Sequence, residues 1–379
     1  MTNIYIIRHA EAEGNLYRRV QGHHDGKITR RGHSQIAALA ERFKDVHIDA
    51  LYASDLSRTH VTATAITKYH DLPMNIDARL KEVCMGVWEN ATWGDVGLED
   101  PEQLANFSSD PDNWSVPGSE SYAHLGDRML ECVTELAKKH DGQTIVLVSH
   151  GMAIRCLHCR ILGVPSREIH SIPHGDNTCV SLYVWDGENL LPQFRNDNSH
   201  LDENTSTFIR QTWWKRSSGN DGNNLRFEKL DLDKERDYYV SCYADAWQTI
   251  HGSLKGFDEN AYVVHARRHA SGKDCLVKVI SAGETIGVVE LDLERGREEG
   301  YGWISFFYLD ADHRGQGFAP QLLGHAATAA REQGYGKLRL NVAECNKRAI
   351  GFYEYFGFKQ IDTNMGVLGL LKQMEWVLP

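Results

Sequence analysis

Three short apolar segments in the first 151 residues constrain the fold more than any other feature of the chain. They read "IYIIRHA" at 4–10, "DALYASDLSR" at 49–58 and "TIVLVSHG" at 144–151, and each apolar run ends in polar residues. Such runs are typical of strands buried on both faces of a parallel sheet. Segments with helical spacing separate them, for example "ITRRGHSQIAALAERFKD" at 28–45. This alternation predicts an α/β fold with a doubly wound, mostly parallel sheet.

We expect the polar residues that end these segments to meet at one crevice. Ligands of an open parallel sheet bind beyond the carboxyl ends of its strands. Arg8 and His9 follow the first strand, and Arg58 and His150 follow the other two. Two guanidinium groups and two imidazoles favour a dianionic phosphoryl ligand, because the guanidinium fork matches phosphate oxygens. The alternative is that the arginines form unrelated surface ion pairs and that the histidines cap strands.

The character of the sequence changes near residue 202. "DENTSTF" at 202–208 and "SSGNDGNNL" at 217–225 are polar and rich in turn-forming residues. We therefore predict a first domain at 1–201, a linker at 202–224 and a second domain at 225–379. Two tryptophans within the linker, Trp213 and Trp214, are expected to dock on one of the domains. The second domain reads as α+β, with two helices, a hairpin, a glycine-rich turn before a helix, and final strands.

The charge and composition of the chain limit the classes of partner that it can bind. The chain has 41 Lys and Arg against 52 Asp and Glu, a formal net charge of −11, which argues against nucleic acid and anionic membranes. No apolar stretch reaches the roughly 18 residues that a membrane span needs, and no signal peptide is recognised, so we expect a cytoplasmic protein. Cys156 and Cys159 have metal-like spacing but no second pair, so we expect packing residues and predict no metal site.

The first 200 residues also carry a family resemblance. It rests on "RHAEAEGN", "VQGHHDGKITRRGHSQIAALA", "YASDLSRT", "LKEVCMGVWEN", "PGSES" and "VSHGMAIR". Together, and in this order, these motifs resemble the histidine phosphatase superfamily, which is also called phosphoglycerate-mutase-like. Ala10 stands where many members have glycine, and Asn90 replaces the glycine that usually follows the Trp-Glu pair.

The resemblance implies metal-independent hydrolysis of a phosphomonoester. His9 would attack phosphorus and form a phosphohistidine, while Arg8, Arg58 and His150 would stabilise the equatorial oxygens. Glu82, partly protonated near neutral pH because it lies near Trp88, would protonate the leaving group. The substrate-binding residues would be Asn15, Gln21 and Gly22. The substrate would be a small phosphorylated metabolite, with residues 90–121 as a lid. "AEGN" and "VQGHHD" look more like the phosphatase branch, and a mutase-type phosphotransferase is the alternative.

A second resemblance covers residues 225–379. "HRGQGFAPQLLGHA" at 313–326 and "NVAECNKRAIGFYEYFGF" at 341–358 are similar to the GNAT N-acetyltransferase superfamily. The resemblance implies acetyl-CoA as donor and an amine as acceptor, with Tyr353 as general acid. Glu290 and a water relay are the candidate bases. The cofactor would be bound by Leu309, Arg314, Gly315, Gln316, Gly317, Phe318, Ala319 and Asn346.

These observations predict a bifunctional enzyme that joins a phosphatase to an acetyltransferase. The alternative for the second half is a module that binds acyl-CoA without turnover. The sequence leaves open whether the protein forms a homo-oligomer.

Overall fold

The computed structural model describes residues 1–211, 224–270, 272 and 274–379, and for Arg210 only the backbone. The chain forms two compact units, Met1–Asp221 and Gly222–Pro379. The division lies inside the predicted linker, and Trp213 and Trp214 lie outside the described residues. No helix in the described part of the chain combines the length and apolarity needed to cross a bilayer.

The first part of the predicted linker packs on the first unit. The Ser206 hydroxyl donates a hydrogen bond to the Asp176 carboxylate at 2.6 Å, and the Gln35 amide donates to the Thr205 carbonyl at 2.8 Å. Ser206 and Thr207 are both buried. Residues 202–208 are thus an ordered extension of the first unit, because their hydroxyl and carbonyl groups meet buried polar partners.

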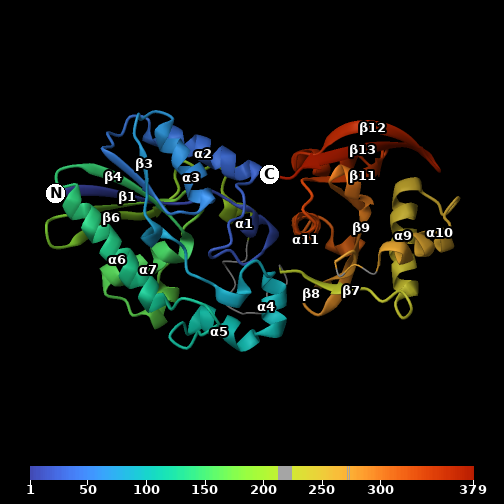
Figure 1. The fold of residues 1–379 in the computed structure, drawn as a ribbon, viewed down its shortest axis with the longest axis horizontal. Coiled ribbons are helices and arrows are strands. Elements are labelled where there is room, and N and C mark those ends of the chain that lie inside the picture. The colour runs from blue at the N-terminus through green and yellow to red at the C-terminus, as the bar shows by residue number, and fades with distance from the viewer. Residues whose placement is uncertain (212–223, 271, 273) are drawn as a thin grey trace. The chain divides into compact units, whose positions relative to one another are not determined.

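The first unit is built on a six-stranded sheet with the order β3-β2-β4-β1-β5-β6 (Figure 1). Strands β1 to β4 are parallel to one another, whereas β5 and β6 form an antiparallel hairpin that closes beside β1. The strands are β1 (Thr2–Arg8), β2 (Ala50–Ala53), β3 (Met74–Ile76), β4 (Thr144–Ser149), β5 (Val180–Trp185) and β6 (Leu190–Asp197). The helices are α1 (Glu13–Tyr17), α2 (Arg30–Phe43), α3 (Ser57–Thr67), α4 (Trp93–Glu99), α5 (Pro101–Ser109), α6 (Tyr122–Lys139), α7 (Gly151–Leu162) and α8 (Thr207–Arg210).

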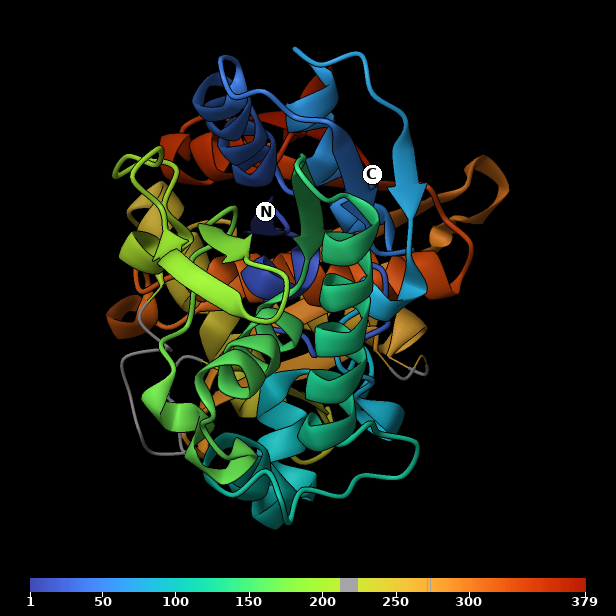
Figure 2. The same ribbon diagram turned by 90° about the vertical axis from the view of Figure 1, so that its left-hand side faces the viewer.

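Helices cover both faces of this sheet, as a doubly wound fold requires (Figures 1 and 2). Alternate residues of β1 point to opposite faces, so Ile6 packs in a core with α6 and α7. Ile7 packs in a second core with α2 and α3. Cys156 and Cys159 of α7 are buried in the first of these cores, where they serve as packing residues.

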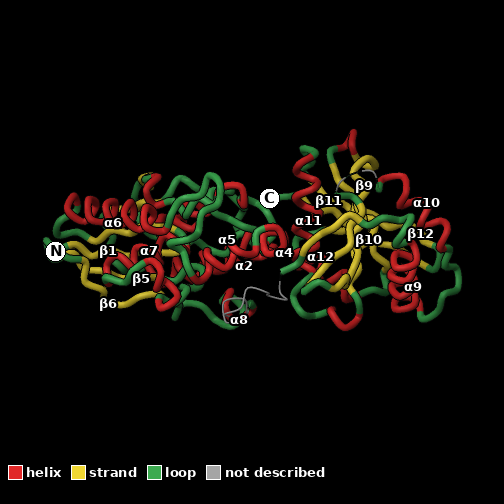
Figure 3. Tube along the Cα trace, turned by 90° about the horizontal axis from the view of Figure 1, so that it is seen from below, coloured by secondary structure: helices red, strands yellow, loops and turns green. Residues whose placement is uncertain are grey.

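The second unit is a seven-stranded sheet with the order β12-β13-β11-β10-β9-β8-β7. Only β10 and β11 are parallel neighbours, and the other pairs are antiparallel. Helices α9 and α10 lie on the other side of the strands from α11 (Figures 1 and 3). The strands are β7 (Arg226–Lys229), β8 (Leu276–Ser281), β9 (Glu284–Gly296), β10 (Tyr301–Leu309), β11 (Lys337–Ala343), β12 (Lys359–Gly366) and β13 (Gly369–Val377). The helices are α9 (Arg236–His251), α10 (Glu259–His269), α11 (Ala319–Glu332) and α12 (Lys347–Tyr355).

Candidate active sites

The register of two parallel strands brings the two predicted histidines together. The pairing of β1 with β4 ends at Arg8 and Ser149, so His9 and His150 follow side by side. Their ring centroids are 5.2 Å apart and both side chains are buried. His9 Nδ1 lies 2.7 Å from the Ala10 carbonyl oxygen, which makes it the donor and leaves a lone pair on Nε2. Burial, followed by the charges of Arg58 and Arg8, lowers the pKa of His9 well below its usual value, so the ring is neutral at neutral pH.

Arg58, from the first turn of α3, is completely buried beside His150. Its guanidinium donates to the carbonyl oxygens of Gly22 at 2.6 Å and His24 at 2.9 Å, and its Nε donates to His150 Nδ1 at 3.2 Å. Burial lowers the pKa of Arg58 to about 10, so it stays charged at neutral pH. His150 Nε2 meets the Ser54 hydroxyl at 2.7 Å. His150 therefore orients the cation as well as lining the site.

The Nε–H group of Arg8 donates to none of the described residues, which indicates a site for an anionic ligand. One terminal nitrogen donates to the Gly175 carbonyl oxygen at 2.6 Å. Its Nε is buried and hydrogen-bonds to none of the described residues. A buried guanidinium N–H without an acceptor costs about 1–3 kcal/mol or more. A phosphoryl oxygen would remove this cost, so the buried cations fit the predicted ligand.

Glu82 is buried but faces the N-terminus of α7. Its carboxylate accepts hydrogen bonds from the backbone N–H groups of Met152 at 3.0 Å and Ala153 at 2.9 Å, and from Val83 at 3.0 Å. These donors stabilise the negatively charged carboxylate. Trp88, which was predicted to lie near Glu82, packs against Phe107 and Trp114. The helix terminus, which the residue pattern does not reveal, thus dominates the surroundings of Glu82.

The predicted substrate-binding residues lie around the same loops. Asn15 Oδ1 accepts from the Ala12 N–H at 3.0 Å and lies 3.5 Å from the amide nitrogen of Asn177. Both amide atoms of Gln21 are buried without a hydrogen-bond partner among the described residues. Gln21 packs so tightly on Gly14 that a Cβ there would lie 2.0 Å from Gln21 Oε1. The carbonyl of Gly22 is a ligand of Arg58, which links these loops to the cationic cluster.

Two residues without a predicted role also shape the site. The Glu89 carboxylate accepts from four backbone N–H groups at 2.8–3.2 Å, those of Gly22, His23, His24 and Met85. It therefore holds the loop whose carbonyls bind Arg58. The buried Asn177 donates to the His9 carbonyl at 3.0 Å. Glu89 lies within the quoted "GVWEN" motif, but nothing in the residue type of Asn177 marks it.

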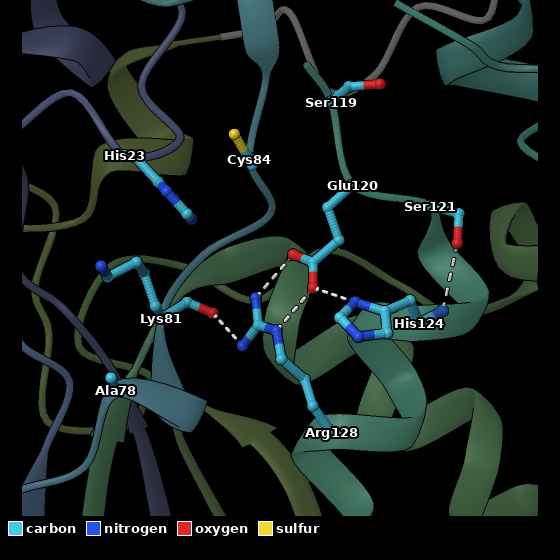
Figure 4. Close-up of a pocket in the computed structure, with 9 residues that line it drawn as sticks. All are labelled: His23, Ala78, Lys81, Cys84, Ser119, Glu120, Ser121, His124 and Arg128. Carbon is cyan, nitrogen blue, oxygen red and sulfur yellow. Dashed lines mark hydrogen bonds and ion pairs between the residues drawn. The ribbon is translucent and has the colours of Figure 1, made fainter.

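A cavity of about 620 Å³ adjoins the loop that carries Glu82 (Figure 4). Arg128 and His23 of its lining both contact the Glu82 carbonyl oxygen at 3.0 Å. Its two cations are already paired, Arg128 with Glu120 at 2.7 Å and Lys81 with Asp55 at 2.6 Å. The remaining polar lining consists of the side chains of His23, Cys84, Ser119, Ser121 and His124. The cavity suits a polar organic group better than a second phosphate.

The second unit has a backbone arrangement that fits acetyl-CoA. The parallel pairing of β10 with β11 stops at Ile304 and Leu340, although β10 continues to Leu309. The strands therefore separate beside Leu309, where an extended ligand can pair with the free backbone edge. The turn from Arg314 to Phe318 leads into α11, and Gly315 and Gly317 have φ values of 84° and 87°. A Cβ on Gly317 would meet no protein atom within 4 Å, so the backbone of this turn is open to a pyrophosphate.

The side chains of this turn contribute less than its backbone. Arg314 forms an ion pair with Asp245 at 2.7 Å and donates to the Leu309 carbonyl at 2.7 Å. The Gln316 amide donates to the Asp312 carbonyl at 2.6 Å, and Phe318 is buried. Ala319 begins α11. The main-chain N–H groups are therefore what the turn offers to an anion.

Two further predicted residues lie on α12. Asn346 Oδ1 caps the helix by accepting from the Ala349 N–H at 3.1 Å, which leaves its amide nitrogen for a ligand. Tyr353 is buried between Phe352 and Phe358, and its hydroxyl hydrogen-bonds to none of the described residues. Burial raises the pKa of Tyr353, so the phenol keeps its proton at neutral pH.

Glu290 is not placed to accept a proton directly from a substrate. The residue is completely buried on β9, and its carboxylate contacts Tyr239, Tyr243, His265 and His269. Burial acts to raise its pKa, but the hydrogen bonds from the two histidines and Tyr239 prevail and lower it to about 2. A carboxylate this acidic and enclosed is a weak base.

Comparison with known proteins assigns each of the two units to a protein family. A model of the histidine phosphatase superfamily (branch 1) matches residues 4–198, and a model of the GNAT acetyltransferase family matches residues 232–358. Phosphoserine phosphatase 1 of Hydrogenobacter thermophilus is 30% identical over 203 residues, which are 54% of this chain and 96% of the relative. The probable phosphoglycerate mutase GpmB of Salmonella choleraesuis is 34% identical over 169 residues, which are 44% of this chain and 77% of the relative.

A solved structure matches the first unit. Bacillus stearothermophilus YhfR has a TM-score of 0.52 and 28% identity, and covers 53% of this chain and all of its own. Both predicted resemblances are confirmed, as is the fold class of each unit. The chain therefore belongs to the histidine phosphatase superfamily, branch 1, and carries a GNAT acetyltransferase domain in its second half.

Proposed function

We propose that the first unit hydrolyses phosphomonoesters through a phosphohistidine at His9. The observation that carries the proposal is the buried Nε of Arg8, which hydrogen-bonds to none of the described residues, beside a neutral His9. His9 Nε2 attacks phosphorus, and the bond from phosphorus to the ester oxygen breaks. Arg8 and Arg58 neutralise the charge on the equatorial oxygens.

Glu82 handles the proton in both halves of this reaction. It gives a proton to the departing ester oxygen, then takes one from the water that cleaves the phosphohistidine. Three backbone N–H donors hold this carboxylate beside the N-terminus of α7. Water supplies the oxygen of the released phosphate, and His9 returns to its neutral state.

The test is turnover of p-nitrophenyl phosphate by the full chain in excess chelator. We expect activity to persist with chelator and to vanish in His9→Ala, while the thermal midpoint and acetyl-CoA binding stay unchanged. Wild-type turnover in His9→Ala, or complete loss of activity with chelator, contradicts the mechanism.

We infer that the leaving group is small and polar and extends toward the cavity of Figure 4. The polar lining supports this, and so does similarity to a protein named as a phosphoserine phosphatase. Phosphate release from phosphoserine, phosphoglycerates and sugar phosphates would rank the substrates. Conversion of one phosphoglycerate isomer to another without phosphate release would favour the mutase alternative.

We propose that the second unit transfers an acetyl group from acetyl-CoA to an amine. Acetyl-CoA, when bound, supplies the activated thioester. The N–H groups of the Gly315–Phe318 turn and the β10 edge at Leu309 would hold the cofactor, and the amide of Asn346 would donate to it. Tyr353 Oη would give its proton to the departing sulfur, and a water relay would take the proton that the attacking amine loses. Thiol release across an amine panel is the test: Tyr353→Phe should retain binding but slow transfer. Binding without thiol release from any amine would favour the non-catalytic alternative.

A further inference from the structure

Three potential metal ligands converge on the second unit, away from the turn before α11. His265 and His269 lie one helical turn apart on α10, and Asp292 lies on β9. One nitrogen of each imidazole and one carboxylate oxygen of Asp292 all lie within 4.8 Å of one another. Residues four apart share one face of a helix. His269 is buried, whereas 43% of the His265 side chain and 17% of the Asp292 side chain are exposed, so an ion can reach the cluster.

A buried carboxylate already orients both imidazole rings. His265 Nδ1 lies 3.2 Å from Glu290 Oε1, and His269 Nε2 lies 2.8 Å from the same oxygen. The other oxygen of Glu290 accepts from the hydroxyls of Tyr239 at 2.7 Å and Tyr243 at 3.1 Å. Histidines that bind metal ions commonly donate their second nitrogen to a carboxylate, which fixes the tautomer and the ring orientation. Glu290 is in the position for that supporting role.

The facing atoms of His269 and Asp292 are too far apart for a hydrogen bond between them. His269 Nδ1 and Asp292 Oδ2 are 4.0 Å apart. The other oxygen of Asp292 accepts from the N–H groups of Glu294 at 3.1 Å and Arg295 at 3.0 Å, which fixes the carboxylate. Bonds from zinc to nitrogen or oxygen are about 2.0–2.2 Å long, so two of them span about 4 Å at a wide angle.

We propose that His265, His269 and Asp292 bind a divalent transition-metal ion of the zinc class. Two imidazoles and one carboxylate suit such an ion better than Mg²⁺ or Ca²⁺, which prefer oxygen ligands. Three protein ligands leave a fourth position for water. The ion links α10 to β9. This site departs from the prediction of no metal, because Asp292 is 23 residues from His269 in the sequence and reaches it only through the packing of α10 on the sheet.

The proposal is tested with the purified full chain, stripped of metal with chelator and dialysed. Titration with Zn²⁺ alone and with Co²⁺ alone gives the affinity, and elemental analysis gives the number of ions per chain. The parent should bind one ion per chain. His265→Gln and Asp292→Asn should each lower the affinity for this ion at least tenfold. Zn²⁺ should raise the thermal midpoint of the second unit in the parent and not in these variants.

Matched controls separate this site from cysteines and histidines elsewhere. His251→Gln removes an imidazole from α9, and Glu294→Gln removes an exposed carboxylate two residues from Asp292. Both controls should bind Zn²⁺ like the parent. Far-ultraviolet circular dichroism of the stripped proteins checks that each variant is folded. The proposal fails if the stripped parent binds no Zn²⁺ at about 100 micromolar, which corresponds to a binding free energy of about 5.5 kcal/mol. It also fails if His265→Gln and Asp292→Asn retain the parental affinity. In either case the cluster is a hydrogen-bonded network only.

Discussion

Replacing Glu89 with glutamine should impair the phosphatase although Glu89 touches none of the reacting groups. Each carboxylate oxygen accepts two backbone N–H groups: Oε1 those of His23 and Met85, and Oε2 those of Gly22 and His24. A glutamine amide nitrogen cannot accept, so one pair of hydrogen bonds is lost and donors face donors. Hydrogen bonds to a charged acceptor contribute about 1.5–3 kcal/mol each. We take the lower end for this half-exposed loop, which gives about 3 kcal/mol for the pair.

This energy acts on the loop that positions Arg58 through the carbonyls of Gly22 and His24. If it is expressed in the transition state, kcat/KM for p-nitrophenyl phosphate falls about 100-fold, because each 1.36 kcal/mol is a factor of ten. Glu102→Gln, at an exposed position on α5, is the control and should keep parental kinetics. The loss should appear mainly in kcat, and binding of inorganic vanadate should weaken with it. Parental kcat/KM in Glu89→Gln would show that the position of Arg58 does not depend on this carboxylate.

Three further variants test other parts of the molecule. Gly317→Val should weaken acetyl-CoA binding at least tenfold in calorimetry, about 1.4 kcal/mol. Gly334→Val, at a glycine with a similar positive φ and open surroundings, should not, and equal losses would contradict cofactor binding by the turn from Arg314 to Phe318. Glu82→Gln should slow hydrolysis of alkyl phosphates much more than that of p-nitrophenyl phosphate, and equal slowing would exclude an acid role. His158 is fully buried, and this burial, followed by the charges of Arg195 and Arg155, lowers its pKa from 6.5 to about 3. Below pH 6.5 the unfolded chain therefore binds a proton at His158 that the folded chain does not bind. The free energy of unfolding therefore falls as the pH drops below 6.5, by about 2 kcal/mol at pH 5. Urea unfolding at several pH values should show that His158→Leu removes this decrease. An unchanged dependence of the unfolding free energy on pH in His158→Leu would contradict the prediction.

The residue pattern predicted the main strands and helices and the polar groups at the strand ends. Apolar runs that end in Arg8–His9 and His150 predicted parallel strands with a shared ligand site, and the register of β1 with β4 places these residues side by side. The glycines at 315 and 317 predicted a turn before a helix, and the backbone forms this turn with positive φ at both glycines. These features are local, because strand pattern and turn conformation depend on residues within a few positions of one another.

The surroundings of those residues come from the packing of the chain and could not be predicted from the residue pattern. Glu89 acts on a loop that lies 65–67 residues away in the chain, and Glu82 meets the start of α7 about 70 residues away. Glu290, a candidate base from sequence, is enclosed by side chains of α9 and α10. The sequence does not reveal which groups will surround a carboxylate in the folded chain. Its hydrogen-bond donors and its burial, which set its protonation and therefore its role, come from segments that share no local pattern with it.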